Sequence, residues 1–237
     1  MNQPDLNIPI IFEDDRVIVF DKPSGVVVNR SQTWSESTLA DFAQERLSSE
    51  DIEDNDSDFY SRGGIVHRLD KDTSGIVLGA KDEDTFEYLK SLFKLRKVKK
   101  KYRAVCIGEM RYEELLVNAP IGRNPKSRLK LACVEGGKEA RTDVELIKVF
   151  EIDGIKFSSV LAKPLTGRTH QIRVHLASIN LPIAGDVIYL GRRMFWSTHP
   201  HFSRLMLHAH ELSFYDDVSK KDMTFTSPLP KEFLDIE

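Results

Sequence analysis

Short apolar runs alternate with turns at the start of the chain, a pattern typical of β-strands. Residues 9–12 and 16–20 are rich in β-formers and flank three consecutive acids, so we predict two strands joined by a hairpin or tight turn. Residues 22–25 (Lys-Pro-Ser-Gly) break the pattern. The apolar run at residues 26–28 then predicts a further short strand.

Helical periodicity appears in three places, where apolar residues recur every three or four positions. We predict a helix over residues 38–47, with Leu39, Phe42, Ala43 and Leu47 on one face and Ser37 or Thr38 as the cap. A second helix is predicted over residues 82–95 and should bury Phe86, Leu89 and Phe93. A third is predicted over residues 169–179, with Ile172, Leu176 and Ile179 on one face and Asn180 at its end.

Strand-like segments dominate the rest of the chain. They are residues 76–80, 102–107, 142–149, 157–162, 205–214 and 223–225. Strands outnumber helices and are joined mainly by turns, which favours an α+β fold built on a largely antiparallel mixed sheet with flanking helices. Because no linker is long enough to separate two domains, we expect residues 1–237 to form one domain.

Charge is distributed unevenly although the net charge is only −3. Residues 50–58 carry six acids and no base, and this segment predicts a mobile surface loop. Residues 94–130 carry twelve lysines or arginines against three glutamates, a local charge of +9. Such asymmetry indicates a polyanionic partner on one face, and a solvated basic surface is the alternative.

The remaining composition indicates an intracellular enzyme or binding protein. Cys106 and Cys133 are the only cysteines, which favours a reducing compartment without disulfides. No run of about 18 apolar residues is present, and the first ten residues do not resemble a secretory signal. We therefore expect a cytoplasmic protein without membrane spans.

Residues 63–75 (GGIVHRLDKDTSG) form the densest group of chemically active side chains. A strand beginning at Ile65 would place charged groups at its end, before a Thr-Ser-Gly turn. Basic neighbours favour the ionised form of the Asp70 carboxyl, which could then serve as a nucleophile or a base. Alternatively, Asp70 is structural and caps the turn through the amides of Thr73 and Ser74.

The string HRLDxxTSG at residues 67–75 resembles the catalytic motif of the RNA pseudouridine synthases of the RluA type. Five further strings resemble that family in the family's order: residues 21–25 (DKPSG), 101–104 (KYRA), 164–175 (PLTGRTHQIRVH), 185–189 (GDxxY) and 207–209 (LHA). They extend over nearly the whole chain. One motif alone would be weak, but six in order are specific.

The resemblance implies isomerisation of uridine to pseudouridine in RNA by base flipping, without a cofactor, in a central active-site cleft. It assigns Asp70 as the catalytic carboxylate, which either attacks the ribose or removes a ribose proton. Arg173 is expected to form an ion pair with Asp70, and Tyr102 to stack on the uracil or to place its hydroxyl near it. Residues expected to contact the base or the RNA are His67, Arg68, Arg168, Ile172, Lys99, Lys100 and Lys101. Among these, Arg68 is expected to fill the space left by the flipped nucleotide, and the lysines to contact phosphates.

Several alternatives bear on this assignment. Arg173 could be a surface helix residue, Tyr102 a core aromatic, Arg68 a structural or phosphate-contacting residue and Ile172 a core residue. The pairs His199/His201 and His208/His210 lack further ligands at suitable spacing, so no metal is expected. A non-catalytic RNA-binding protein, and a hydrolase that pairs Asp70 with Asp72, are the rival functions.

The expected substrate is a structured RNA, ribosomal RNA first and transfer RNA as the second possibility. The first family motif begins too early for the S4-type RNA-binding domain that many members carry. Target choice is therefore expected to rest on the catalytic domain and its insertions, including residues 50–62. No obligate protein partner is implied, and we expect a monomer.

Overall fold

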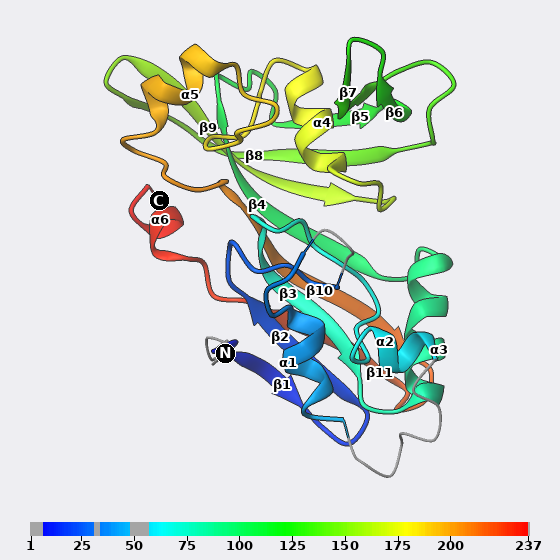
Figure 1. Ribbon diagram of the computed structural model, residues 1–237. Helices are drawn as coiled ribbons and strands as arrows, with labels where there is room; N and C mark the ends of the chain where they lie inside the picture. Colours follow the sequence, from blue (N-terminus) through cyan, green and yellow to red (C-terminus); the bar gives the residue numbers. More distant parts are fainter. Residues whose placement is uncertain (1–6, 31–33, 48–56, 237) are drawn as a thin grey trace. The chain divides into compact units, whose positions relative to one another are not determined.

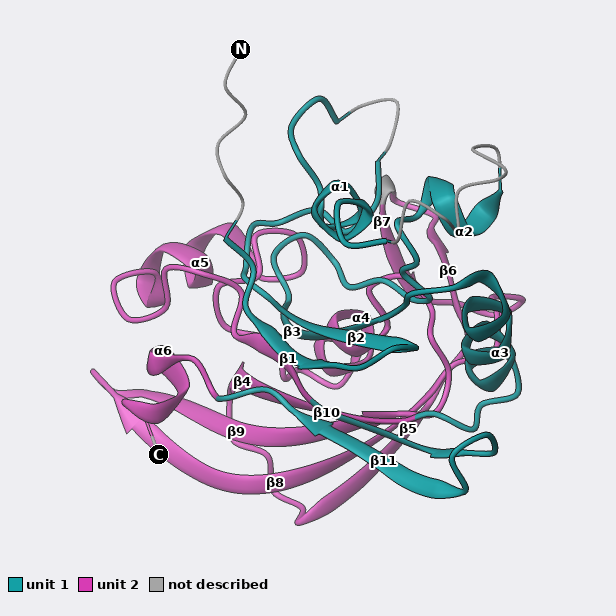
Figure 2. Ribbon diagram, turned by 90° about the horizontal axis from the view of Figure 1, so that it is seen from below, with its two compact units in different colours: residues 1–98, 211–228 teal, residues 99–210, 229–237 magenta. Residues whose placement is uncertain are grey.

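The residues that the structure describes fall into two compact units. The computed structural model describes residues 7–30, 34–47 and 57–236. Unit 1 comprises Met1–Val98 and Glu211–Pro228, and unit 2 comprises Lys99–His210 and Leu229–Glu237 (Figure 2). Each unit has its own hydrophobic core. The expectation of one domain over residues 1–237 stays a prediction.

Unit 1 is built on five strands. Their order is β1 (Ile10–Glu13), β2 (Val17–Lys22), β3 (Ser74–Ala80), β10 (Leu207–Asp216, in this unit from Glu211 onward) and β11 (Lys221–Thr226). Of these, β1 and β2, β2 and β3, and β10 and β11 pair antiparallel. The carboxylate of Asp14 accepts from the amides of Arg16 and Val17 at 2.9 and 2.6 Å, which closes the β1–β2 turn. The predicted hairpin is confirmed, because the acids between the two apolar runs supply this turn.

Two helices of unit 1, α1 and α3, pack against its strands (Figure 1). Phe42 of α1 (Leu39–Gln44) contacts Phe20 of β2, with ring centroids 6.1 Å apart. Helix α3 (Glu83–Lys94) buries its apolar face in the core that contains Val19. Val19 and Phe20 are adjacent in β2, so their side chains point to opposite faces of the strands. The helices that they contact, α3 and α1, therefore lie on different faces. The short α2 (Asp58–Ser61) follows its cap Ser57.

Unit 2 has a four-stranded antiparallel arrangement in the order β4 (Lys99–Ile107), β9 (Ile155–Pro164), β8 (Arg141–Ile152) and β5 (Glu114–Asn118). Strands β8 and β9 are joined by Asp153 and Gly154, whose φ angles are 50° and 75°. Positive φ at both positions of a two-residue hairpin loop explains the Asp-Gly sequence. A separate hairpin pairs β6 (Ile121–Asn124) with β7 (Ser127–Cys133).

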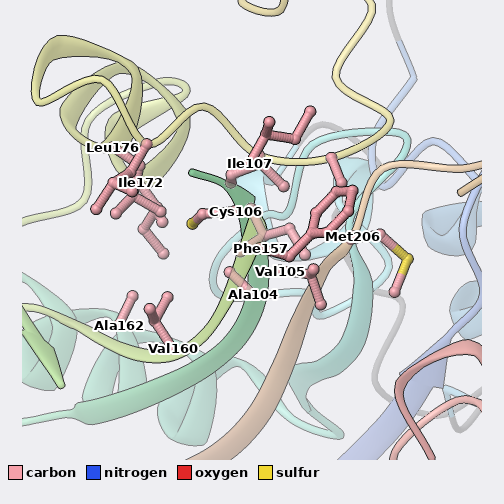
Figure 3. Packing of buried hydrophobic residues seen from close by; sticks show 14 of the residues in the cluster. Ala104, Val105, Cys106, Ile107, Phe157, Val160, Ala162, Ile172, Leu176 and Met206 are labelled. Atoms are coloured by element: carbon pink, nitrogen blue, oxygen red, sulfur yellow. The ribbon is translucent and has the colours of Figure 1, made fainter. Parts of the chain in front are cut away.

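Helix α4 (Gln171–Ser178) packs on the core of unit 2, whose strand residues come mainly from β4 and β9 (Figure 3). Ile172 and Leu176 lie in this core. Polar contacts fix the helix as well: Gln171 Nε2 and His175 Nδ1 lie 3.0 and 2.9 Å from the Thr142 hydroxyl of β8. Burial lowers the pKa of His175, which favours its neutral form. Helices α5 (Arg192–Thr198) and α6 (Lys231–Leu234) complete the unit.

The predicted α+β class with a largely antiparallel sheet is confirmed. The capping prediction for α1 is confirmed at Thr38, whose hydroxyl accepts from the Asp41 amide while the Asp41 carboxylate accepts from the Thr38 amide. In α3, Leu92 is buried with Phe86 and Leu89, and Phe93 is only half-buried.

Two strand predictions were wrong. Residues 26–28 form no strand, because the carbonyls of Val27 and Val28 accept from the first amides of α1, at Leu39 and Ala40. Ile65 forms only an isolated bridge with Gly79, and residues 66–73 are a loop that leads into β3. The acidic segment predicted as a mobile loop lies outside the described residues except for Ser57 and Asp58, which begin α2.

Candidate active site

Asp70 lies in the loop of residues 66–73 that precedes β3 in unit 1. Its side chain is half-buried between the exposed Arg68 and Lys71. The amide of Thr73 donates to the backbone carbonyl of Asp70 at 3.1 Å, which makes a tight turn. This hydrogen bond fixes the backbone of the turn through the Asp70 carbonyl.

A buried lysine ties this loop to the end of β2. The Lys22 ammonium is fully buried and donates to the carbonyls of Pro23, Val26 and Lys71 at 2.8 to 2.9 Å. Three hydrogen bonds to carbonyl dipoles offset the desolvation of the ammonium. Because one acceptor is the residue after Asp70, Lys22 fixes the backbone that carries Asp70.

The turn after Lys22 adds two more contacts to the same loop. The Ser24 hydroxyl donates to the Asp72 carbonyl at 2.7 Å, and the Gly25 amide donates to the Lys71 carbonyl at 2.9 Å. Gly25 has φ of 90°, a conformation that L side chains rarely adopt. The two sequence motifs DKPSG and HRLDxxTSG are therefore one structural assembly.

His67 and Arg68 differ in their surroundings. The Nε2 atom of His67 accepts from the amide of Leu78 at 3.0 Å, and its ring stacks on Phe93 with centroids 4.7 Å apart. An accepting Nε2 requires a neutral ring with the proton on Nδ1. These contacts anchor the loop to β3 and α3, while Arg68 is exposed.

Arg173 is buried on α4 of unit 2 and holds a bidentate ion pair with Asp186. Its Nε and Nη2 atoms donate to the two carboxylate oxygens of Asp186 at 2.7 and 2.9 Å. The exposed fractions of the two side chains are 4% and 0%, so the pair is shielded from water. The alternative of a surface arginine is wrong for Arg173.

The Asp186 carboxylate also organises the loop that follows it. Its Oδ1 atom accepts from the amides of Ile188 and Tyr189 at 2.9 and 3.0 Å. The Tyr189 hydroxyl lies 2.9 Å from His170 Nδ1, and its ring lies 5.2 Å from the Arg173 guanidinium carbon. A Cβ at Gly185 would approach the Arg204 carbonyl to 1.8 Å, so only glycine fits before Asp186.

Sequence reasoning missed the roles of Lys22 and Asp186, although both stand in the strings that were singled out. The available signals were a lysine two residues after an apolar run and directly before proline, and an aspartate after a glycine between apolar residues. Charged residues in such apolar surroundings are expected to be paired.

The other predicted site residues of unit 2 lie on β4, α4 and the turn before α4. Tyr102 is half-buried, pairs with Ala162 across β4 and β9, and packs against the core. Ile172 is a core residue, with 6% of its surface exposed. The Nε atom of Arg168 donates to the Glu139 carbonyl at 2.9 Å, and its backbone amide donates to Gln171.

The lysines at the start of β4 are unequally exposed. Lys99 is exposed, whereas Lys100 and Lys101 are half-buried. Burial lowers the pKa of Lys100 from its ordinary value of 10.5 to about 8. The ammonium therefore remains charged at neutral pH and loses its proton within an accessible range.

We expect the Lys100 amine to make the free energy of unfolding rise with pH between about 8 and 10.5. In that window the unfolded chain binds more protons at this lysine than the folded chain does, so raising the pH favours folding. Below pH 8 the lysine is charged in both states, and the folded state bears the whole free-energy cost of burying the charge. Lys100→Met should therefore stabilise the protein more at pH 7 than at pH 10. Urea unfolding at both pH values measures this, with the exposed Lys99→Met as control. Equal pH dependence in the two variants would contradict the shifted pKa.

The described residues lack two other kinds of feature. They contain no group of three or more histidine, cysteine, aspartate and glutamate side chains arranged to hold a metal ion. Across residues 7–30, 34–47 and 57–236, no helix has the length and apolar character needed to cross a membrane.

Known proteins resemble the chain over almost its whole length. Residues 16–178 match the family described as RNA pseudouridylate synthase. The ribosomal large subunit pseudouridine synthase D of Pseudomonas aeruginosa is 34% identical over 97% of this chain and 71% of its own length. The protein of the same name from Nitrosomonas europaea is 37% identical over 95% of this chain and 63% of its own length.

A solved structure agrees with these sequence matches. The human RNA pseudouridylate synthase domain containing 1 has a TM-score of 0.75 and 26% identity, covering 97% of this chain and 87% of that one. The predicted resemblance is confirmed, and the matched range includes Asp70, Tyr102 and Arg173. The chain belongs to the RNA pseudouridylate synthase family and is an isomerase that acts on uridine in RNA.

Proposed function

We propose that the chain converts specific uridines of large-subunit ribosomal RNA to pseudouridine, with Asp70 as the catalytic carboxylate. The bond between ribose C1′ and uracil N1 breaks, the base turns, and C5 bonds to C1′. The C5 proton leaves and N1 gains a proton, so the product is an isomer of the substrate. The target uridine is flipped out of its stack to make C1′ accessible.

The observation that carries the proposal is the assembly around the Asp70 loop, in a chain whose family match covers it. Lys22, Ser24 and Gly25 fix the carbonyls of Lys71 and Asp72, and His67 fixes the other side of the loop. Rigid support of this kind is what a catalytic group requires, because a displacement of about 1 Å can reduce rate about 100-fold.

Four further residues have proposed roles in the same reaction. Arg173, already oriented by Asp186, pairs with Asp70 and keeps it ionised. Tyr102 stacks on the flipped uracil or places its hydroxyl near it, with Ile172 beneath. The exposed Arg68 fills the space that the flipped nucleotide leaves.

The proposed substrate rests on charge and on the relatives. The two curated relatives are named as ribosomal large subunit synthases. Lys99, Lys100, Lys101 and Arg168 supply phosphate contacts that do not depend on sequence. We propose a monomer that acts in the cytoplasm, with transfer RNA as the second candidate substrate.

Incubation with large-subunit ribosomal RNA transcripts labelled in uridine tests the proposal. After digestion to nucleosides and chromatography, we expect a new nucleoside of the same mass as uridine. Release of free uracil would identify a hydrolase, in which Asp72 is the candidate second carboxylate. Stable binding without a new product would identify a non-catalytic RNA-binding protein.

A further inference from the structure

Helix α5 in unit 2 exposes apolar side chains that do not pack against the core of the unit. Phe195 is half-buried against the core of unit 2, and Thr198 is buried with its hydroxyl donating to the Met194 carbonyl at 3.0 Å. These two residues attach the helix to the unit. In contrast, Trp196 is 62% exposed and Met194 is 42% exposed. Exposed tryptophan on a helix that is already anchored indicates an interaction surface.

Positive charge lies on the same side of the helix as the indole. Arg192 and Arg193 are exposed and precede Trp196 by four and three residues, the two spacings that bring helical side chains together. Residues 187–210 contain no aspartate or glutamate, whereas a stretch of 24 residues with the chain's average of 37 acids in 237 would contain about four. Arg192, Arg193 and Trp196 therefore form a cationic aromatic surface on a segment that carries no acid of its own; Asp153, from the turn between β8 and β9, pairs with His201 of this segment at 3.0 Å.

The indole is held by its neighbours. Its ring centroid lies 5.4 Å from that of Phe195 and 5.7 Å from that of His199, and Phe195 in turn is part of the packed core surface. The Ser197 hydroxyl donates to the Arg193 carbonyl at 3.0 Å. A ring with restricted motion loses little entropy when a ligand stacks on it.

We infer that this surface binds an unpaired segment of the RNA substrate, with a nucleobase stacked on Trp196 and neighbouring phosphates paired with Arg192 and Arg193. RNA supplies both the flat apolar ring and the negative charge that the surface complements. A second copy of the chain fits less well, because two cationic faces repel each other. Three exposed apolar residues (Val187, Met194 and Trp196) also fall far short of the roughly 20 residues per side of a stable protein interface.

This inference rests on the proposed RNA substrate but not on the chemistry at Asp70. It assigns α5 a part in choosing substrates, since stacking requires a base that is not already paired. RNA with a loop or single strand near the target uridine would be preferred over a continuous duplex.

Binding of a twelve-nucleotide oligoadenylate tests the inference without catalysis. We expect the oligonucleotide to quench tryptophan fluorescence in the wild type and not in Trp196→Phe, although both retain Trp34. Anisotropy of a labelled oligonucleotide should show affinity within about three-fold of wild type for Trp196→Phe. Trp196→Ala should bind about five-fold or more weakly, because stacking on an aromatic side chain is lost.

The double variant Arg192→Gln/Arg193→Gln tests the phosphate contacts. It should reduce the slope of log affinity against log salt by about 1.4, since each single-strand phosphate contact contributes about 0.7. Tyr112→Ala is the matched control, because Tyr112 is 67% exposed in the same unit but is followed by two glutamates. It should leave affinity within two-fold, and melting temperatures should confirm that all variants fold.

Equal affinity of Trp196→Ala and Tyr112→Ala for the oligonucleotide, or no quenching of Trp196, would overturn the inference. So would sedimentation showing that Trp196→Ala disrupts a dimer while RNA affinity is unchanged. The Asp70→Asn protein should bind oligoadenylate as the wild type does. If the wild type forms no pseudouridine but Trp196→Ala still weakens binding, the proposed function fails and the α5 surface stands.

Discussion

Asp70→Asn should abolish pseudouridine formation while RNA affinity stays within a few-fold of wild type. The substitution keeps the shape of the side chain and removes the negative charge on which either nucleophilic attack or proton removal depends. The loop should keep its conformation, because the Lys22 ammonium and the Thr73 amide hold the backbone carbonyls of residues 71 and 70, which the substitution leaves in place. Single-turnover nucleoside chromatography and filter binding measure the two quantities.

Asp72→Asn is the matched control for this experiment. Asp72 lies in the same loop, is half-buried like Asp70, and offers its backbone carbonyl to Ser24. It should retain most of the activity, since its carboxylate has no role in the isomerisation. Substantial turnover by pure Asp70→Asn protein would refute the assignment of Asp70, and loss of activity only in Asp72→Asn would transfer it to Asp72.

Arg173→Ala should reduce turnover severely and also destabilise the fold. Removing the guanidinium leaves the Asp186 carboxylate buried without its bidentate partner. Breaking a buried ion pair in this way lowers the free energy of unfolding by about 3–5 kcal/mol. If Arg173 also orients the Asp70 carboxylate, its loss removes a charge-assisted contact to the catalytic group. The single-turnover rate measured on the folded variant should then fall far below that of the wild type.

The two effects of Arg173→Ala can be separated. Stability, measured by urea unfolding, reports the ion pair with Asp186, whereas the single-turnover rate at a temperature where the variant is folded reports the contact with Asp70. Arg173→Lys keeps the charge but not the planar fork, so we expect partial activity. A wild-type rate in folded Arg173→Ala would limit Arg173 to its structural pairing with Asp186 and would make Arg168 the candidate partner of Asp70.

Local patterns predicted much of the fold because they act over a few residues. The acids at residues 13–15 predicted the first hairpin, Thr38 predicted a cap, and apolar periodicity predicted α3 and α4. The short strands of the β6–β7 hairpin were not predicted, since polar and apolar residues do not alternate cleanly there. The strand predicted at residues 26–28 does not form, because the carbonyls of Val27 and Val28 accept hydrogen bonds from amides of α1, a contact that depends on tertiary structure.

The sequence identified candidate site residues but not the contacts that hold them in place. Motif resemblance identified the positions of Asp70, Tyr102 and Arg173 within one family. No periodicity indicates that Lys22 donates to the loop 49 residues later, or that Asp186 pairs with Arg173. Such contacts depend on how distant segments meet, and a sequence pattern of local range carries no record of them.

Mapping of pseudouridine in ribosomal RNA from cells with and without this protein tests the central claim most directly. We predict that one or more pseudouridines of large-subunit ribosomal RNA are lost without the protein, return with the wild type, and do not return with Asp70→Asn. Large-subunit ribosomal RNA whose pseudouridines are unchanged by loss of the protein would contradict the account.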